Sequence, residues 1–575
     1  MKFNASIKNQ FCYGIDAVIM NPSKMKDSLI VIFAIVILTI FSGCSKQEIN
    51  REVNGLEVKR PNILLIVADD MGYTDIGAFG GEIDTPNIDM LASSGLSFSN
   101  FHTAPMCAVT RAMLLSGNDN HIAGMGSQDL NSQAFGYEGH LTDRIVPLPA
   151  LLQKAGYHTS MVGKWHLGTA PDHLPANKGF AQSFIIPEGV ANHYSDKGWL
   201  ARDPVSTYLE NNEPVKWKEG DYSTDVYTSK IIEYIDNNKD SDKPFFAFAA
   251  YTSPHWPLQV DEAYWKKYEG KYRDGYEVLR QNRFTSLKKL GLIAESAELP
   301  DTHESVKPWS TLSADEKLIE ERKMELYAGM VDNLDVNIGR IVDYLKQTNQ
   351  FENTLIVFMS DNGAAANDFY YHPYFAEFLN ANYTDAYAEM GKKDSFISYG
   401  PQWAEAGSAP FRYFKGYTTQ GGITSPMLIS GAMVKHKGTV TKTFTSLLDI
   451  APTFYEYAQI DYPESFLGKE VYPLKGASMA SLLEQKADFL HDANYVFAME
   501  HRHNIVVRKG DWKLVNETKP FDPQNFALYN LAEDAGEQNN LKGEYPLVYQ
   551  DMLAHWQTYK LESQVQFPTP SGVSK

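Results

Sequence analysis

The chain has 575 residues, a formal net charge of −19 and a hydrophobic content of 43%. Its length allows a large catalytic domain with at least one smaller domain. Because Asp and Glu outnumber Lys and Arg by 71 to 52, the chain offers no basic surface for nucleic acid. Any anionic substrate must therefore be bound by a local cluster of Lys, Arg, His or metal.

An apolar run, Leu29–Phe41, lies near the N-terminus and follows a Met-Lys pair that begins at Met25. The run is shorter than the ~20 residues that span a bilayer, so we expect a signal-peptide core, with an uncleaved anchor helix as the alternative. The next residues, Ser-Gly-Cys, end at Cys44 and resemble a bacterial lipobox, which implies cleavage before Cys44 and lipidation of its thiol. Met25 is then a better start than Met1. We therefore expect a bacterial lipoprotein that faces the periplasm or the cell surface.

Four apolar runs rich in β-branched and aromatic residues end in polar side chains that can do chemistry. "NILLIVADD" ends at Asp69 and Asp70, "TSMVGKWH" at Lys164 and His166, "PFFAFAAYTSPH" at His255, and "TLIVFMSDN" at Asp361 and Asn362. Unbroken apolar strands that alternate with helices predict an α/β fold with a large, mostly parallel sheet sandwiched by helices. Ligands of such sheets bind beyond the carboxyl ends of the strands, so these side chains should meet in one crevice.

The helices between these strands have clear start and stop signals. Thr85 and Pro86 are typical of the first residues of a helix that Gly95 should end. Residues 315–347 form one long helical pattern or two. The charged and aromatic stretch 262–310 is predicted to be a helical insertion over the rim of the crevice.

The character of the chain changes after residue 460. Residues 490–531 are typical of short strands, and "NIVVRKGDWKLV" predicts a hairpin that turns at Gly510-Asp511. We therefore expect a smaller C-terminal α+β domain built on an antiparallel sheet. The predicted division is a signal segment at 1–44, a linker at 45–60, a catalytic domain at 61–460 and the C-terminal subdomain at 461–575.

The strand-end acids are candidate metal ligands. Asp69 and Asp70 alone could simply cap the next helix. Together with Asp361 and Asn362, however, they form a set of oxygen ligands, which suits a hard cation such as Ca²⁺ or Mg²⁺ better than Zn²⁺.

Cys107 needs a separate explanation, because the chain has only three cysteines and the other two, Cys12 and Cys44, are near the N-terminus. If Cys12 is removed and Cys44 is lipidated, Cys107 cannot form an intramolecular disulfide. Residues 110–115 look helical, which places Cys107 at the positive end of a helix with Arg111 one turn later, where a thiolate should be stabilised. The alternative is a small buried hydrophobic residue.

The stretch "CAVTRAMLLSG" resembles the signature of the type I, formylglycine-dependent sulfatases, in which a cysteine is followed at i+4 by Arg. The resemblance covers nearly the whole mature chain. Further motifs in family order are "NILLIVADDMGYTDIGAFGGEIDTPNID", "GYHTSMVGKWHLG", "SPHWPLQ", "VFMSDNGA", "FRYFKGYTTQGGI" and "ALYNLAEDAGEQNNL". The sequence is similar to the bacterial arylsulfatases, which implies the alkaline-phosphatase-like fold and hydrolysis of sulfate monoesters to an alcohol or phenol plus sulfate.

The resemblance also implies a role for each matching residue. Cys107 would become Cα-formylglycine through a cysteine-modifying maturation enzyme, and its hydrate would be the nucleophile. One Ca²⁺ per chain would be held by Asp69, Asp70, Asp361 and Asn362 against residue 107. The remaining roles are steadying of the formylglycine by Arg111, sulfate binding by Lys164 and Lys415, protonation of the leaving oxygen by His255, and release of sulfate by His166. The expected partner is a sulfated small molecule or glycan.

One departure and two alternatives remain. Val109 stands where the family usually has Pro or Ala, which bears on recognition by the maturation enzyme. The first alternative is a phosphate or phosphonate ester hydrolase of the same superfold. The phosphatases use Thr or Ser as the nucleophile and bind two transition metals, whereas a phosphonate hydrolase can share the formylglycine. The second is a non-catalytic glycan-binding lipoprotein, in which aromatics such as those of "FYYHPYFAEF", residues 369–378, stack on sugars. Residues 369–378 and 396–410 are expected to form the rim of the site.

Overall fold

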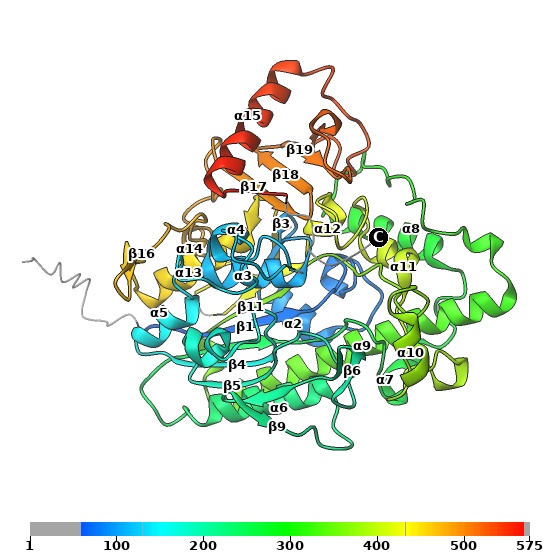
Figure 1. Ribbon diagram of the computed structural model, residues 1–575, viewed down its shortest axis with the longest axis horizontal. Helices are drawn as coiled ribbons and strands as arrows, with labels where there is room; N and C mark the ends of the chain where they lie inside the picture. Colours follow the sequence, from blue (N-terminus) through cyan, green and yellow to red (C-terminus); the bar gives the residue numbers. More distant parts are fainter. Residues whose placement is uncertain (1–58, 129, 432, 568–575) are drawn as a thin grey trace, which may run out of the picture. The chain divides into compact units, whose positions relative to one another are not determined.

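A ten-stranded sheet forms the centre of the computed structural model, which describes residues 59–128, 130–431 and 433–567 (Figure 1). Its strand order is β13-β2-β12-β11-β1-β10-β4-β5-β8-β9. The strands are β1 (Asn62–Ala68), β2 (Gly95–Phe98), β4 (His158–Lys164), β5 (Gln182–Ile186), β8 (Tyr208–Glu210), β9 (Glu213–Val215), β10 (Phe245–Ala250), β11 (Thr354–Ser360), β12 (Met427–Ser430) and β13 (Thr439–Thr441). The five strands from β11 to β5 are parallel to one another, while β12 and β8 run antiparallel to their neighbours on either side. The predicted mostly parallel sheet is confirmed.

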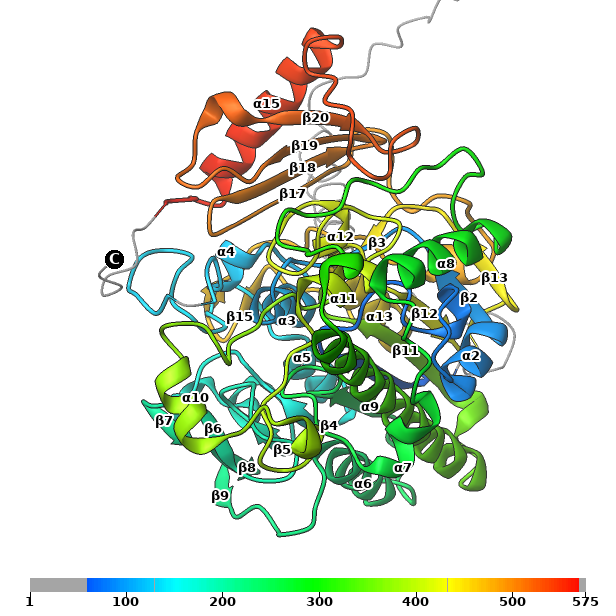
Figure 2. The same cartoon turned by 90° about the vertical axis from the view of Figure 1, so that its right-hand side faces the viewer.

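Helices pack on both faces of this sheet because its central strands are apolar on both sides. On β1, Leu64 and Ile66 face one core and Ile63 and Leu65 face the other. The first core contains residues of α2 (Pro86–Ser93), α6 (Ser223–Asp236) and α9 (Ala314–Gln347). The second contains residues of α3 (Cys107–Ser116), α5 (Leu148–Lys154) and α13 (Ile450–Ala458). Figure 2 shows α6 and α9 along the sheet from the side.

The four strands with polar ends lie next to each other in the order β11, β1, β10 and β4. In this register Ala68 pairs with Ser360, and Ala250 pairs with Gly163. The residues that follow these strands therefore emerge at one edge of the sheet, as the sequence predicts.

Two of the helix predictions need comment. Residues 315–347 belong to one helix, α9, which begins with a capping box between Ser313 and Glu316. Gly95 does not end α2, because the helix stops at Ser93 and Gly95 is the first residue of β2. A Cβ at Gly95 would lie 2.2 Å from the carbonyl oxygen of Ile429, so the glycine permits close approach of the neighbouring strand β12.

The insertion 262–310 contains helices and, within the described residues, no strand. Its α-helices are α7 (Glu262–Trp265) and α8 (Tyr276–Lys289). Buried Arg283 of α8 pairs with Asp75, which follows β1, and Arg280 pairs with Glu405 of α11 (Gly400–Gly407). The insertion is thus fixed by ion pairs to the segment after β1 and to α11.

The C-terminal part is a four-stranded antiparallel meander with one long helix (Figure 2). Its elements are β17 (Val496–His501), β18 (Asn504–Lys509), β19 (Trp512–Asn516), β20 (Ala527–Asn530) and α15 (Pro546–Glu562). Lys509 pairs with Trp512 across the turn at Gly510, which confirms the predicted hairpin. Ile505, Leu514 and Trp556 belong to the core between sheet and helix.

The remaining regular elements are short. They are α4 (Asn120–Ala123), α10 (Ala376–Asn382), α12 (Gln420–Ile423), α14 (Ala480–Leu483), β3 (Phe101–His102), β6 (Lys197–Leu200), β7 (Asp203–Val205), β14 (Thr445–Ser446), β15 (Ser465–Phe466) and β16 (Lys469–Glu470).

The predicted signal segment, lipobox and most of the linker lie outside the described residues, as do Cys12 and Cys44. Within the residues that are described, none of the helices has both the length and the apolar character needed to cross a membrane.

Candidate active site

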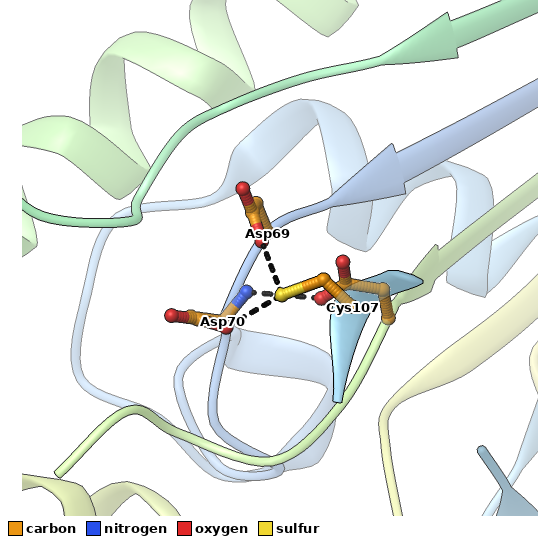
Figure 3. A group of neighbouring side chains, drawn as sticks. Asp69, Asp70 and Cys107 are labelled. Carbon is orange, nitrogen blue, oxygen red and sulfur yellow. Dashed lines mark hydrogen bonds between the residues drawn. The ribbon is translucent and has the colours of Figure 1, made fainter. Parts of the chain in front are cut away.

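Three carboxylates and one thiol form a buried cluster at the carboxyl ends of β1 and β11. The ligand atoms of Asp69, Asp70, Cys107 and Asp361 lie within 4.8 Å of one another, and all four side chains are buried. Cys107 Sγ is 3.4 Å from Asp69 Oδ1 and 3.7 Å from Asp70 Oδ1 (Figure 3). The cluster thus joins the first residue of α3 to the ends of two adjacent strands.

Three cations neutralise the three carboxylates one by one. Lys164 Nζ lies 2.7 Å from Asp69 Oδ2, and Arg111 Nη2 donates to Asp361 Oδ2 at 2.9 Å. Lys415 Nζ lies 2.6 Å from Asp70 Oδ1 and 3.2 Å from Cys107 Sγ. Burial of so many charges is tolerable only because each has a partner of opposite sign.

The set of donor atoms fits a hard metal ion. Asn362 donates through Nδ2 to Asp70 Oδ1 at 2.7 Å, while its Oδ1 is buried without a hydrogen-bond partner among the described residues. Within the part of the chain that the structure describes, Asp70 Oδ2 accepts no hydrogen bond either, although His255 Nε2 lies 3.3 Å away. Buried oxygen atoms without donors are costly unless something electropositive reaches them. Carboxylate and amide oxygens are the ligands that Ca²⁺ and Mg²⁺ prefer.

Backbone strain marks two of the predicted site residues. Asp70 has a φ of 67° and His166 a φ of 57°, values that non-glycine residues rarely adopt. The strain at Asp70 is stabilised locally, because its amide donates to Asp361 Oδ1 and the amide of Met71 donates to Ser360 Oγ. Strain of this kind is concentrated at functional sites.

The prediction of a stabilised thiolate at Cys107 is wrong for this form of the site. The thiol is 2% exposed, and burial together with the charge of Asp361 raises its pKa well above the usual range. Cys107 does occupy the first position of α3, with Gly117 after the end of that helix, as expected. The positive end of the helix and the nearby lysines favour the thiolate of Cys107. Burial and the neighbouring carboxylates disfavour it more strongly, so the thiol keeps its proton.

The two histidines, His166 and His255, share an electrostatic environment, because burial and the charges of Lys164 and Lys415 lower the pKa of both. Burial lowers the pKa of His255 to about 3, with Lys415 and Lys164 contributing and Asp70 opposing. Burial, followed by the charge of Lys164, lowers the pKa of His166 well below its usual range. The Nδ1 atom of His166 has no hydrogen-bond partner among the described residues. Both rings are therefore neutral in this form.

Two acids of the C-terminal part, Glu517 and Glu537, bind the backbone of the segment that follows Lys415. Sequence reasoning did not find this role of the two acids. Glu517 accepts hydrogen bonds from the amides of Thr418 and Thr419 at 2.9 and 3.2 Å, and Glu537 accepts from the amide of Gln420 at 2.7 Å. These acids lie more than 90 residues from their partners. Glu537 lies within the motif "ALYNLAEDAGEQNNL", which gave no role for it, and no motif marks Glu517. Burial raises the pKa of Glu517 to about 7.

Comparison with known proteins identifies the family of this site. A family model described as "Sulfatase" matches residues 61–460, and one described as "N-sulphoglucosamine sulphohydrolase, C-terminal" matches residues 411–564. The chain is 38% identical to an uncharacterized sulfatase of Schizosaccharomyces pombe over 88% of this chain and 95% of that protein. It is also 38% identical to an arylsulfatase of Klebsiella aerogenes over 74% of this chain and 93% of that protein.

Solved structures share the fold. Ps i-CgsB in complex with k-i-k-neocarrahexaose aligns with a TM-score of 0.63 and 24% identity, covering 89% of this chain and 94% of that one. BT4656 in complex with D-glucosamine-2-N,6-O-disulfate aligns with a TM-score of 0.59 and 19% identity, covering 88% and 98%. Because the family model spans residues 61–460 and two sulfatases are 38% identical over most of their length, the chain belongs to the sulfatase family and is a sulfuric ester hydrolase.

Proposed function

We propose that this sulfatase hydrolyses sulfate monoesters of glycans and aryl alcohols, with Cys107 converted to Cα-formylglycine and with one Ca²⁺ held by Asp69, Asp70, Asp361 and Asn362. The observation that carries the proposal is the position of Cys107 Sγ, which lies 3.4 Å from an Asp69 oxygen and 3.2 Å from Lys415 Nζ. A group at this position faces both the carboxylates that would hold the metal and a cation that can bind sulfate.

Conversion of Cys107 replaces its thiol, which leaves as hydrogen sulfide, by a carbonyl oxygen taken from water, and two electrons and two protons pass to an oxidant. A maturation enzyme that supplies this oxidant is therefore needed. Because the side chain is only 2% exposed in the folded protein, such an enzyme must act before folding is complete. Arg111 supports the converted residue, since its Nε has no hydrogen-bond partner among the described residues while its Nη atoms are already bound to Lys164 O and Asp361. Val109 is completely buried, so its difference from the family motif lies inside the core.

The residues around the cluster supply the rest of the chemistry. When bound, Ca²⁺ would offset the carboxylate charge and polarise the sulfate oxygens. Lys164 and Lys415 bind the sulfate charge as it shifts during S–O cleavage. His255 delivers a proton to the leaving oxygen, and it can hold that proton only when the anionic substrate offsets the low pKa caused by burial. His166 assists the release of sulfate from residue 107.

A glycan substrate is supported by two similar proteins. One is an N-acetylglucosamine-6-O-sulfatase of Bacteroides thetaiotaomicron, 24% identical to this chain, and the other is Ps i-CgsB, solved with a neocarrahexaose. The arylsulfatase of Klebsiella aerogenes supports aryl sulfates as test substrates. Both classes present one sulfate to the same cluster, so both belong in one assay panel.

We also propose that the protein is a lipoprotein anchored through Cys44 and facing the periplasm or the cell surface. The support is the lipobox-like sequence after Leu29–Phe41. Replacing Cys44 by Ser should release the protein from membranes in cell fractionation, and unchanged membrane association would favour an anchor helix.

The central experiment combines peptide mass spectrometry with activity. Protein made beside a maturation enzyme should give a Cys107 peptide whose mass matches formylglycine, together with release of sulfate from aryl or glycan sulfates. Active enzyme with only a free thiol at residue 107 contradicts the proposed nucleophile. Faster hydrolysis of phosphate or phosphonate esters than of every sulfate ester contradicts the proposed substrate class.

A further inference from the structure

The peptide that carries His255 lies in a loop beyond the end of β10. The strand ends at Ala250, and the two prolines on either side of His255, Pro254 and Pro257, have no amide hydrogen to donate. The loop is therefore poorly suited to continue the ladder of the sheet, and other groups must hold it in place. One bond is local, because the amide of His255 donates to the carbonyl of Thr252 at 3.1 Å.

The ring of His255 is oriented by its own backbone. Its Nδ1 lies 2.7 Å from the carbonyl oxygen of Trp256. A carbonyl oxygen can only accept a hydrogen bond, so Nδ1 carries a hydrogen and donates it. Under the proposed function, Nε2, which lies 3.3 Å from Asp70 Oδ2, is then the atom that gives a proton to the leaving oxygen. The position of Nε2 depends on how firmly the backbone of His255 and Trp256 is held.

His193, in the loop between β5 and β6, holds this backbone. Its side chain is buried, with Nε2 3.1 Å from the carbonyl oxygen of His255 and Nδ1 2.7 Å from Oγ of Ser223, the first residue of α6. The carbonyl of His255 requires the hydrogen on Nε2, so Nδ1 accepts a hydrogen bond from the hydroxyl of Ser223. Burial lowers the pKa of His193 to about 4, so near neutral pH the ring keeps one donor and one acceptor.

The backbone of His193 is itself fixed from two directions. Its amide donates to Gln259 Oε1 at 2.9 Å, and its carbonyl accepts from the amide of Ser223 at 2.8 Å. Gln259 is buried and donates through Nε2 to the carbonyls of Lys393 and Ser395 at 3.0 and 2.8 Å. His193 therefore connects the peptide of His255 to α6 and to the segment 393–395. A polar network in which each buried group has a partner is suited to fix one geometry.

We propose that His193 is a positioning residue for proton transfer by His255. It acts through the peptide of His255 rather than on the substrate, and a shift of about 1 Å in a catalytic group can cost about 100-fold in rate. The inference rests on the proposed function, because it takes His255 as the group that protonates the leaving oxygen. It adds that the need for His193 grows with the need of the leaving group for a proton.

A series of aryl sulfates tests this dependence. The esters are 4-nitrophenyl, 4-chlorophenyl, phenyl and 4-methoxyphenyl sulfate, whose phenols become less acidic in this order. We expect His193→Leu to lower kcat/KM about 10- to 100-fold for phenyl and 4-methoxyphenyl sulfate but at most about threefold for 4-nitrophenyl sulfate. A merely structural role would lower kcat/KM by the same factor for every ester. The formylglycine and metal contents are measured for each protein, and neither should change.

Three further variants separate positioning from general damage. His193→Gln places an amide N–H near the position of Nε2 and should bring kcat/KM to within about threefold of the wild type on every ester. Tyr251→Phe removes a buried hydroxyl that lies 2.7 Å from Thr228 Oγ1, close to His255 in the chain, and its effect should be the same for all esters. In the His255→Ala background, His193→Leu should lower kcat/KM by less than about twofold, because the group that it positions is gone.

Ser223→Ala is the milder test if His193→Leu does not give folded protein. It leaves Nδ1 of His193 without its donor while the bond to the carbonyl of His255 can remain. We then expect the same dependence on the leaving group with a smaller loss, about 3- to 10-fold for phenyl sulfate.

Crystal structures of the wild type and of His193→Leu give a readout that needs no turnover. The ring of His255 should move from its place beside Asp70 in the variant. An unmoved ring, an equal loss on every ester, a His193→Gln variant as slow as His193→Leu, or a full additional loss in the His255→Ala background would each overturn the inference. If the wild type with formylglycine hydrolyses no sulfate ester, the proposed function fails. The two structures then decide alone, since a displaced ring supports the positioning role and an unmoved ring contradicts it.

Discussion

His121 is expected to make the stability of this protein depend on pH in the alkaline range. Its ring is fully buried between two carboxylates, with Nε2 3.1 Å from Glu500 Oε2 and Nδ1 3.5 Å from Asp119 Oδ1. Burial by itself lowers the pKa of the ring, but the hydrogen bonds and charges of Asp119 and Glu500 outweigh it and raise the pKa to about 9. Glu500 belongs to β17 and His121 to α4, so the charged contact joins the C-terminal sheet to the catalytic part.

The magnitude follows from the shift. Relative to the ordinary value of 6.5, a folded-state pKa of about 9 corresponds to about 3 kcal/mol of unfolding free energy. Because the folded pKa is raised, this contribution is fully present below pH 6.5 and is lost as the pH rises through about 9. His121→Gln cannot become charged, so its stability deficit should be large near neutral pH and should nearly disappear above about pH 9.5.

The assay is equilibrium unfolding in urea at several pH values between about 6 and 10, compared between wild type and variant so that other titrating groups cancel. Trp512 and Trp556 lie in the C-terminal part and provide a fluorescence signal for its unfolding. His501→Gln is the matched control: burial lowers the pKa of His501 to about 3, so its effect should be constant above about pH 7. A difference between wild type and His121→Gln that stays constant over the whole range would show that His121 is neutral in the folded protein and would refute the reasoning.

Three further predictions concern the active site. Asp361→Ala should remove metal and activity together, because it deletes a proposed ligand and leaves Arg111 without its carboxylate partner. Elemental analysis should give one Ca²⁺ per chain in the wild type, whereas two zinc ions per chain would favour the phosphatase alternative. His255→Ala should slow the hydrolysis of sugar sulfates far more than that of 4-nitrophenyl sulfate, which leaves without a proton; equal losses on both esters, measured as kcat/KM, would exclude a general-acid role. Glu517→Ala should lower kcat/KM about tenfold while the metal content is kept. The reason is that the amides of Thr418 and Thr419 lose the acceptor that fixes the Lys415 segment. A buried amide left without an acceptor costs about 1–3 kcal/mol. Glu517→Gln retains an acceptor oxygen and should recover most of the activity, whereas equal damage by both changes would show that the charge matters rather than the hydrogen bonds.

Much of the fold could be predicted because its signals are local. The apolar runs before Asp69, Lys164, His255 and Asp361 are strands, although β10 ends at Ala250, five residues before His255, and their parallel order follows from the helices between them. The hairpin at Gly510 is equally local, since its turn residues identify it. The helical pattern at residues 315–347 is local too, but only the structure showed that it is one helix, α9. Gly95 was misassigned because a glycine that ends a helix and one that admits a neighbouring strand look the same in sequence.

The sequence by itself determined which residues could form the site: acids at strand ends, and a lone cysteine with Arg111 one helical turn later. Only the tertiary structure decided how these residues interact. Asp69 meets Lys164 across 95 residues and Asp70 meets Lys415 across 345, and the acceptor for the Lys415 segment comes from a separate sheet. The protonated state of Cys107 was likewise decided by burial and by Asp361, which a helix position alone does not reveal. The physical reason is that periodicity and turn chemistry act over a few residues, whereas desolvation and charge pairing depend on side chains brought together by the order of the strands.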